Sequence, residues 1–299
     1  MKKKGYVFFI IVAAILWSTD GLLRRHLHEI PSTSIVLIEN IIRLIILSPF
    51  ISRFIPEFKK MNKKDWIVMI TLGVTSGALG SVLYTSALAQ VQNISYSVVA
   101  LLQQTQPIFA VLLAVILLKE KISKRYMLFG SIALISAYFL TFPELKPSFI
   151  SGNGELIAAL LALGAAFVWG FGTVLSKIML KKLSYAALVI LRFTVTVPVV
   201  FALNIGLKES YPISLINGTQ WFYLIVIAII SGIVSFALYY KGLQHTEVKV
   251  STFAEFAWPL SAALLGYFVL NETLTLTQWI AGAILLIDIY FLSSTPKKS

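Results

Sequence analysis

The chain has 299 residues, of which 58% are hydrophobic and only 13% are charged, whereas soluble domains carry about 25% charged residues. This composition excludes a soluble globular protein, and the lack of cysteine excludes a disulfide framework and thiol chemistry. The three histidines have no metal-ligand spacing, so we expect no metal and no cofactor.

Ten apolar runs follow one another along the chain, with only short loops between them. A helix of roughly 20 apolar residues is long enough to cross a hydrocarbon core of about 30 Å. The runs do not alternate apolar and polar residues, as the strands of a membrane barrel would. We therefore predict an all-α integral membrane protein with ten transmembrane helices. The predicted ranges are 6–24, 34–54, 66–89, 95–118, 125–142, 154–176, 185–206, 219–243, 249–270 and 275–293.

The net charge of +12 gathers on one side of the predicted membrane. Basic residues beside short loops mark the cytoplasmic side. We therefore expect both termini in the cytoplasm, a location in the cytoplasmic (inner) membrane, and no nucleic-acid partner. The basic segments on that side are Lys2–Lys4, the loop 53–64, Lys119–Arg125, Lys177–Lys182, Lys241, Lys249 and Lys297–Lys298.

The chain also repeats itself. Pro107 returns as Pro259 after 152 residues, and Trp17 returns as Trp169 at the same shift. Each unit contains five predicted helices, and an odd number of crossings forces the two copies to face opposite ways. A site between two inverted halves is typical of secondary transporters. The predicted organisation is a first repeat over 1–142, a linker over 143–152 and a second repeat over 153–299.

Charged groups in the first two helices have partners one turn away. Arg43 follows Glu39, and Arg24 follows Asp20, each at the i,i+4 spacing of a helical ion pair. An unpaired charge at a helix centre costs roughly 2.5–3.5 kcal/mol, so these groups should face the bundle interior. Two interpretations stay open here, because the pairs could serve only helix packing or could meet a cargo.

Small residues recur in the third and eighth helices. Gly73 and Gly77 correspond to Ala228 and Gly232 at a shift of 155 residues. This spacing lets helix backbones approach closely. It indicates either fixed packing or a contact that moves during transport.

The fourth and ninth helices each contain a proline within the apolar run. A proline kinks a helix and frees the carbonyl one turn earlier, here that of Gln103 before Pro107 and that of Glu255 before Pro259. Polar side chains therefore coincide with predicted kinks in both halves, and we predict the binding site at this place. Gln104 and Gln106 stand beside Gln103.

Arg192 and Glu255 lie within the seventh and ninth helices, without an opposite charge on their own helices. Arg192, together with Arg43, could meet a carboxylate or phosphate. Glu255, with Glu39 as a second candidate, could meet an ammonium group or carry a coupling proton. Asp288, near the end of the tenth helix, is interpreted as a snorkelling or packing residue.

Aromatic residues also lie inside the helices, away from the membrane interfaces where aromatic belts form. Each could fill the core, but as a set they could line a pocket for a flat or apolar body. They are Trp17, Tyr84, Trp169, Tyr239 and Trp258.

Three segments carry a resemblance to a known family. Residues 106–120 read Gln-Pro-Ile-Phe-Ala-Val-Leu-Leu-Ala-Val-Ile-Leu-Leu-Lys-Glu, and residues 258–272 read Trp-Pro-Leu-Ser-Ala-Ala-Leu-Leu-Gly-Tyr-Phe-Val-Leu-Asn-Glu. With Thr-Gln-Trp-Ile-Ala-Gly-Ala at 277–283, the chain resembles the drug/metabolite transporter superfamily, of the ten-helix EamA type.

The resemblance implies two inverted five-helix halves, cytoplasmic termini, and a central cavity that moves small metabolites, often outward. Family members often carry Glu before each proline, where this chain has Gln106 and Trp258, so a carboxylate role is not carried over to these two positions. Glu120 and Glu272 match glutamates at the family's loop edges, and we interpret them as helix caps.

We therefore expect a secondary active transporter that exports a small metabolite, such as an amino acid or related zwitterion, by alternating access. The alternatives are an exporter of cationic or aromatic xenobiotics and a non-transporting membrane protein of sensory or lipid-handling type. We expect no enzyme, and as partners a small-molecule substrate, the lipid bilayer and coupling protons, in a monomer or homodimer. The candidate substrate-binding residues are Trp17, Glu39, Arg43, Tyr84, Gln103, Gln106, Trp169, Arg192, Tyr239, Glu255 and Trp258.

Overall fold

A computed structural model describes residues 3–90, 96–141, 153–269 and 273–293. Within these ranges the chain is helical and contains no strand. The first repeat comprises α1 (Lys3–Trp17), α2 (Asp20–Arg25), α3 (Ser32–Leu47), the 3₁₀ turn η1 (Ser48–Phe50), α4 (Ile51–Phe58), α5 (Lys63–Leu72), the π-helix η2 (Gly73–Leu79), α6 (Gly80–Ala89), α7 (Tyr96–Gln103), α8 (Gln106–Leu118) and α9 (Lys124–Thr141).

The second repeat is built in the same order. It comprises α10 (Asn153–Met179), α11 (Tyr185–Gly206), the 3₁₀ turn η3 (Ile213–Leu215), α12 (Gly218–Val226), the π-helix η4 (Ile227–Val234), α13 (Ser235–His245), α14 (Val248–Ala254), α15 (Ala257–Val269) and α16 (Leu276–Ser293). The predicted linker 143–152 lies outside the described residues.

Six helical stretches of the described chain are long and apolar enough to cross a membrane by themselves. The fourth and ninth crossings are each assembled from two shorter helices, α7 with α8 and α14 with α15, and the fifth and tenth are α9 and α16. The protein is thus an all-α integral membrane protein with ten transmembrane helices, as predicted.

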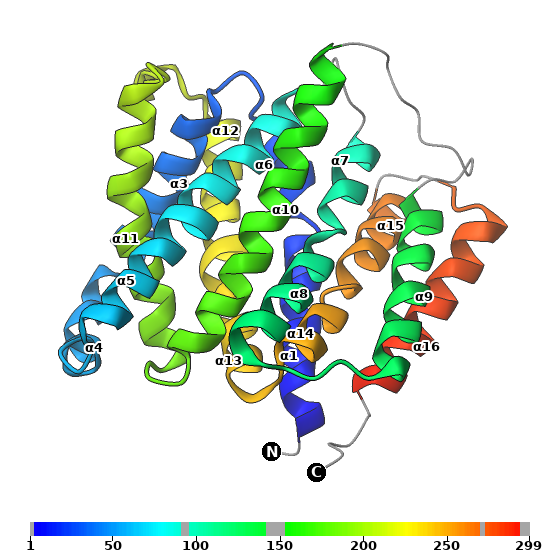
Figure 1. Ribbon diagram of the computed structural model, residues 1–299. Helices are drawn as coiled ribbons and strands as arrows, with labels where there is room; N and C mark the ends of the chain where they lie inside the picture. Colours follow the sequence, from blue (N-terminus) through cyan, green and yellow to red (C-terminus); the bar gives the residue numbers. More distant parts are fainter. Residues whose placement is uncertain (1–2, 91–95, 142–152, 270–272, 294–299) are drawn as a thin grey trace.

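The two repeats are inverted relative to each other (Figure 1). We call the end of the bundle at which α1 begins and α16 ends the base. The first helix α1 runs away from the base, whereas its counterpart α10 runs toward it. The last helices of the two repeats, α9 and α16, pack side by side in opposite directions. The helices α3 and α11, second in each repeat, also pack against each other.

The third helix of each repeat starts with the same local signal. Asn62 accepts a hydrogen bond from the backbone of Asp65, and the Asp65 side chain accepts one from the Asn62 backbone. Asn217 and Gln220 make the same reciprocal pair at the start of α12. Such a capping box satisfies two backbone donors at a helix start. Both pairs stand 155 residues apart, so the repeat extends to the helix caps.

The same two helices contain π-helical segments that the sequence did not predict. Both segments contain the small residues noted above, Gly73 and Gly77 in η2 and Ala228 and Gly232 in η4. A Cβ atom added to Gly77 would lie 2.0 Å from Thr196 Oγ1, and one added to Gly232 would lie 2.1 Å from Arg43 Nε. The predicted close approach is therefore present as packing against the second helix of the opposite repeat.

Three of the predicted continuous helices are interrupted by two turn residues each. The run 6–24 breaks at Ser18–Thr19, the run 95–118 at Gln104–Thr105 and the run 249–270 at Glu255–Phe256. Pro107 and Pro259 stand in the first turns of α8 and α15, where a proline is tolerated because the first-turn N–H groups have no helical partner. The predicted kinks are thus full breaks, a feature of transporter sites.

The prediction that the backbone carbonyl of Glu255 is free is also wrong. It accepts a hydrogen bond from Trp258 N at 2.9 Å, because the chain turns tightly between α14 and α15. At this break, the side chain of Glu255, and not its backbone carbonyl, is therefore the group that contacts other helices.

Candidate functional site

All eleven candidate substrate-binding residues line one cavity between the two repeats, with a volume of about 180 Å³. Helices of both halves contribute, including the interrupted helices and both π-helical segments. Pro107 also lines the cavity. The residues that sequence reasoning named are Trp17, Glu39, Arg43, Tyr84, Gln103, Gln106, Trp169, Arg192, Tyr239, Glu255 and Trp258.

Two matched aromatic clusters form part of the wall. The Trp17 indole donates to Ser231 O at 2.9 Å, and its ring centroid lies 5.1 Å from that of Tyr239 at an interplanar angle of 55°. Ser231 belongs to η4, where the π-helical winding leaves a carbonyl available to a side chain. This cluster joins the first helix of one repeat to the third helix of the other.

The second cluster has the same geometry. The Trp169 indole donates to Ser76 O at 3.1 Å, and its ring lies 5.1 Å from that of Tyr84, again at 55°. Ser76 belongs to η2. Sequence reasoning missed both serines because the functional atom is a backbone carbonyl, although the small-residue spacing marked the segments.

A cluster of four charges lies at one side of the cavity. Arg24 pairs with Asp20 at 2.9 Å and with Glu39 at 2.6 Å, and Glu39 also pairs with Arg43 at 2.8 Å. The Arg43 Nε group donates to the carbonyl of Ala228 at 3.4 Å. Both predicted intrahelical pairs are present, and Arg24, which was not a candidate, connects them. Two cations and two anions neutralise each other, with Glu39 only 1% exposed.

Arg192 is the counterpart of Arg43 in the second repeat, but its contacts are different. Its guanidinium donates to Tyr240 OH, to Ser76 O and to Ser76 Oγ, each at 2.9 Å. It also lies 4.4 Å from the ring centroid of Phe236, a cation–π contact. Among the ion pairs of the described residues, none involves Arg192. This cation is therefore held by neutral groups.

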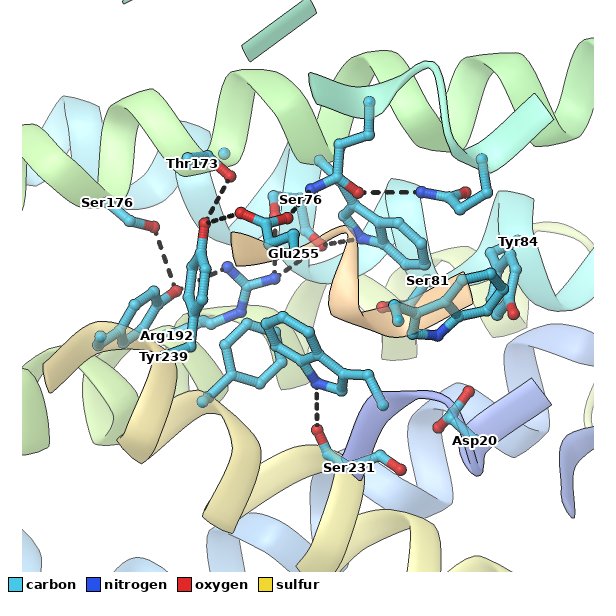
Figure 2. Close-up of a pocket in the computed structure, with 18 of the residues that line it drawn as sticks. Asp20, Ser76, Ser81, Tyr84, Thr173, Ser176, Arg192, Ser231, Tyr239 and Glu255 are labelled. Atoms are coloured by element: carbon cyan, nitrogen blue, oxygen red, sulfur yellow. Dashed lines mark hydrogen bonds between the residues drawn. The ribbon is translucent and has the colours of Figure 1, made fainter. Parts of the chain in front are cut away.

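Glu255 is an anion that is also held by neutral groups (Figure 2). Its carboxylate accepts from Gln106 Nε2 at 3.0 Å and from Tyr239 OH at 2.8 Å. The Tyr239 hydroxyl lies 3.1 Å from Thr173 Oγ1. Within the described chain, no ion pair involves Glu255 either. The carboxylate connects the break in the ninth helix to the break in the fourth.

The glutamines at the break of the fourth helix continue this chain of contacts. Gln103 Nε2 donates to Gln106 Oε1 at 3.0 Å. Gln103 Oε1 and Gln104 Nε2 are buried and have no hydrogen-bond partner among the described residues. Gln104 lines the cavity as well, although it was not among the residues predicted to bind substrate.

Asp288 does not snorkel, so that half of its predicted role is wrong. It is 2% exposed, and neither carboxylate oxygen has a hydrogen-bond partner within the described part of the chain. The reason is that α16 packs against both α9 and α14, and Asp288 is buried among the helices. It does not line the cavity.

Polar contacts at the base lie both within the second repeat and between the two repeats. Within the second repeat, the Lys177 ammonium donates to the carbonyls of Leu243 at 2.7 Å and Gln244 at 3.1 Å, and to that of Thr246. Glu120 accepts from the backbone N–H groups of Val248 at 2.9 Å and Lys249 at 3.3 Å. Glu120 is thus a cap, as predicted, but for the opposite repeat.

Comparison with protein families gives two matches along this chain, over residues 4–142 and 156–294, to the EamA-like transporter family. The chain belongs to the EamA-like transporter family. The two matched segments fall on the two repeats, which confirms the sequence-based recognition and the small-molecule transporter class.

Individual relatives of this EamA-like chain are named as transporters. The riboflavin transporter ImpX of Fusobacterium nucleatum is 33% identical over 280 residues, covering 93% of each chain. The uncharacterized transporter YwfM of Bacillus subtilis is 25% identical over 303 residues, covering 100% of this chain and 97% of that protein. A solved crystal structure, 16% identical, has a TM-score of 0.77 and covers 97% of this chain and 96% of its own, which supports the fold alone.

Proposed function

We propose that this chain is a secondary transporter of a flat heteroaromatic metabolite and that riboflavin is the first cargo to test. The observation that carries the proposal is the pair of Trp–Tyr clusters on the cavity wall, joined there by Trp258. Stacking of a planar base on an aromatic side chain contributes about 1–3 kcal/mol. The relative named as a riboflavin transporter supplies the specific cargo.

The charge arrangement supports the same choice over the expected zwitterion. Arg24 and Arg43 are already bound by Asp20 and Glu39 at 2.6–2.9 Å. A cargo that used either arginine would have to replace a buried ion pair, which is unfavourable by several kcal/mol if one partner is left alone. A cargo that binds through flat rings and hydrogen-bonding edges does not have to replace a buried ion pair.

An amino acid remains a second candidate because of one specific observation. Arg192 and Glu255 line the cavity and each is held by neutral groups. A carboxylate and an ammonium group could meet this separated cation and anion. Competition between labelled riboflavin and amino acids distinguishes the two candidates.

The transport cycle follows from the inverted repeats. Rocking of one half against the other around a fixed central site is the usual alternating-access mechanism of such folds. The contacts of Glu120 with Val248 and Lys249 hold the halves together at the base, so these contacts must open for the cavity to reach that side. We place the base, with both termini, on the cytoplasmic side of the cytoplasmic membrane, in accord with the basic loops.

Coupling to protons is assigned to Glu255 rather than to Glu39. Glu39 is bound in ion pairs by two arginines, whereas the contacts of Glu255 are a neutral hydroxyl and a neutral amide. In proteoliposomes with an imposed pH gradient, Glu255→Gln should make the transport rate independent of the gradient. Gradient dependence equal to that of the wild type would remove Glu255 from this role.

The decisive experiment is flux of labelled riboflavin into proteoliposomes. The wild type should exceed empty vesicles, and Trp17→Ala or Trp169→Ala should lower the rate at subsaturating riboflavin by about 5- to 150-fold, the equivalent of one lost stacking contact. Trp66→Ala is the matched control, because Trp66 is 37% exposed and outside the cavity. Comparison of right-side-out with inverted membrane vesicles tests the expected outward direction. Riboflavin flux no faster than in empty vesicles would overturn the proposed cargo.

A further inference from the structure

A chain of amide and carboxylate groups crosses the cavity at the two helix breaks. Gln103 donates to Gln106 at 3.0 Å, and Gln106 donates to Glu255 at 3.0 Å. Glu255 accepts from Tyr239 at 2.8 Å. The first two residues belong to the fourth helix and the last two to the second repeat, so the relay spans both halves.

The carboxylate fixes the direction of this relay. An ionised carboxylate only accepts hydrogen bonds, so Gln106 must present its NH₂ group to Glu255. The oxygen of Gln106 then faces Gln103 and requires the NH₂ group of Gln103. The remaining atom, Gln103 Oε1, is consequently an acceptor. An isolated amide group could adopt either orientation. Here Glu255 determines the orientation of the Gln103 amide through the hydrogen bonds of Gln106.

The free end of the relay has no partner in the part of the chain that the structure describes, and the next residue in the chain carries a second unpartnered group. Gln103 Oε1 and Gln104 Nε2 are both buried, and neither has a hydrogen-bond partner in the described residues. A buried polar atom without a partner costs about 1–3 kcal/mol. Native structures contain few such atoms, and these two belong to consecutive residues on the cavity wall. One is an acceptor and the other a donor.

We propose that Gln103 and Gln104 are the specificity-determining pair. They bind an edge of the cargo at which an N–H donor stands next to a carbonyl acceptor, and Glu255 sets the orientation of the Gln103 amide through Gln106. A cyclic imide or amide has such an edge, and the flavin ring carries one where its N3–H lies between two carbonyls. This inference rests on the proposed function and names the part of the cargo that is recognised.

The pair would also explain selection among flat molecules. The tryptophan and tyrosine walls accept any planar ring, since every ring has a π-face. A site built to hydrogen-bond a particular group rejects an analogue that lacks it, because its own buried polar atoms are then left unpaired. Specificity therefore comes from the amides, and the aromatic wall supplies affinity.

The test is the binding of riboflavin and of N3-methylriboflavin to the purified full-length protein, by titration calorimetry. The wild type should bind riboflavin about tenfold or more tightly than the methylated compound, which cannot donate from N3. Gln106→Met cuts the relay but leaves Glu255 and Gln103 in place, and the preference should fall to about twofold or less. Gln104→Met should weaken the binding of both compounds to a similar extent, because both keep the carbonyl for which Gln104 is the donor.

Gln278→Met is the matched control. Gln278 is a buried glutamine outside the cavity that donates to Leu140 O, and its loss should leave the preference unchanged. Equal affinity of the wild type for the two compounds would overturn the specificity pair while leaving the proposed cargo intact. If Gln106→Met keeps the preference for riboflavin, the methyl group is excluded only by its size. That result would also overturn the relay. Binding of neither compound would instead overturn the proposed function, and this inference with it.

Discussion

The two repeats share a scaffold but differ in charge. Both have a Trp–Tyr cluster with centroids 5.1 Å apart, a π-helical segment in the third helix and an asparagine capping box before it. The counterpart positions of the polar groups diverge. Arg43 is paired with a carboxylate, whereas Arg192 is held by neutral groups. Gln103 of the first repeat corresponds to Glu255 of the second.

This comparison separates scaffold from chemistry. What both halves share maintains the inverted architecture and the aromatic walls, since either half needs the same helix packing. What differs lies on the cavity wall, where a cargo that is not itself two-fold symmetric would be recognised. The divergent pairs are therefore the better guide to function.

The largest expected effect comes from breaking the charge cluster of the first repeat. Glu39→Gln leaves Arg24 and Arg43 buried with only one carboxylate, Asp20, nearby, and should lower the free energy of unfolding by about 3–5 kcal/mol. Glu255→Gln keeps the hydrogen bonds to neutral neighbours and should change the free energy of unfolding by less than about 1 kcal/mol. Denaturant unfolding in detergent micelles measures both. Equal destabilisation would contradict the charge difference between the repeats.

A smaller effect is expected from the shared packing. Gly77→Ala and Gly232→Ala place a methyl group within 2.1 Å of a neighbouring side chain, so each should destabilise the fold by about 1–3 kcal/mol. Gly206→Ala is the control, because nothing lies within 4 Å of its added Cβ. Thermal unfolding followed by tryptophan fluorescence is the measurement. If Gly206→Ala is as unstable as the two variants, the loss of stability is not due to the close approach of the helices.

The smallest effect tests the symmetry directly. Trp17→Phe and Trp169→Phe each remove one indole hydrogen bond to a π-helical carbonyl while keeping a ring in place. Each should cost about 0.5–1.5 kcal/mol, and the two costs should agree. The same thermal assay applies, with Trp66→Phe as the variant expected to be unchanged. A large difference between the first two would mean that the clusters are alike only in geometry.

Much of the fold could be predicted from sequence because the signals are long and repeated. Hydropathy gives the ten crossings, and the matched pairs Pro107 with Pro259 and Trp17 with Trp169 give the duplication. The candidate site residues were found because polar and aromatic groups are conspicuous in apolar helices, and the structure brings all eleven to one cavity. Their roles in binding stay predictions.

The rest depends on tertiary structure. Hydropathy cannot separate a proline kink from a break, so the interruptions at Gln104–Thr105 and Glu255–Phe256 were missed. The π-helical winding is favoured by packing of Gly77 and Gly232 against the opposite repeat, which no local pattern reports. Arg24 was assigned only to Asp20, because its second partner, Glu39, belongs to another helix.

The most direct test of the central claim, that cargo occupies the cavity between the repeats, uses the absence of native cysteine. Ser81→Cys places a single thiol on the cavity wall, and Ser123→Cys places one at an exposed loop position outside it. The rate of modification by a water-soluble thiol reagent is measured with and without saturating riboflavin. We predict that riboflavin slows modification at position 81 at least several-fold and leaves position 123 unaffected. Riboflavin transport with no protection at position 81 would contradict the account.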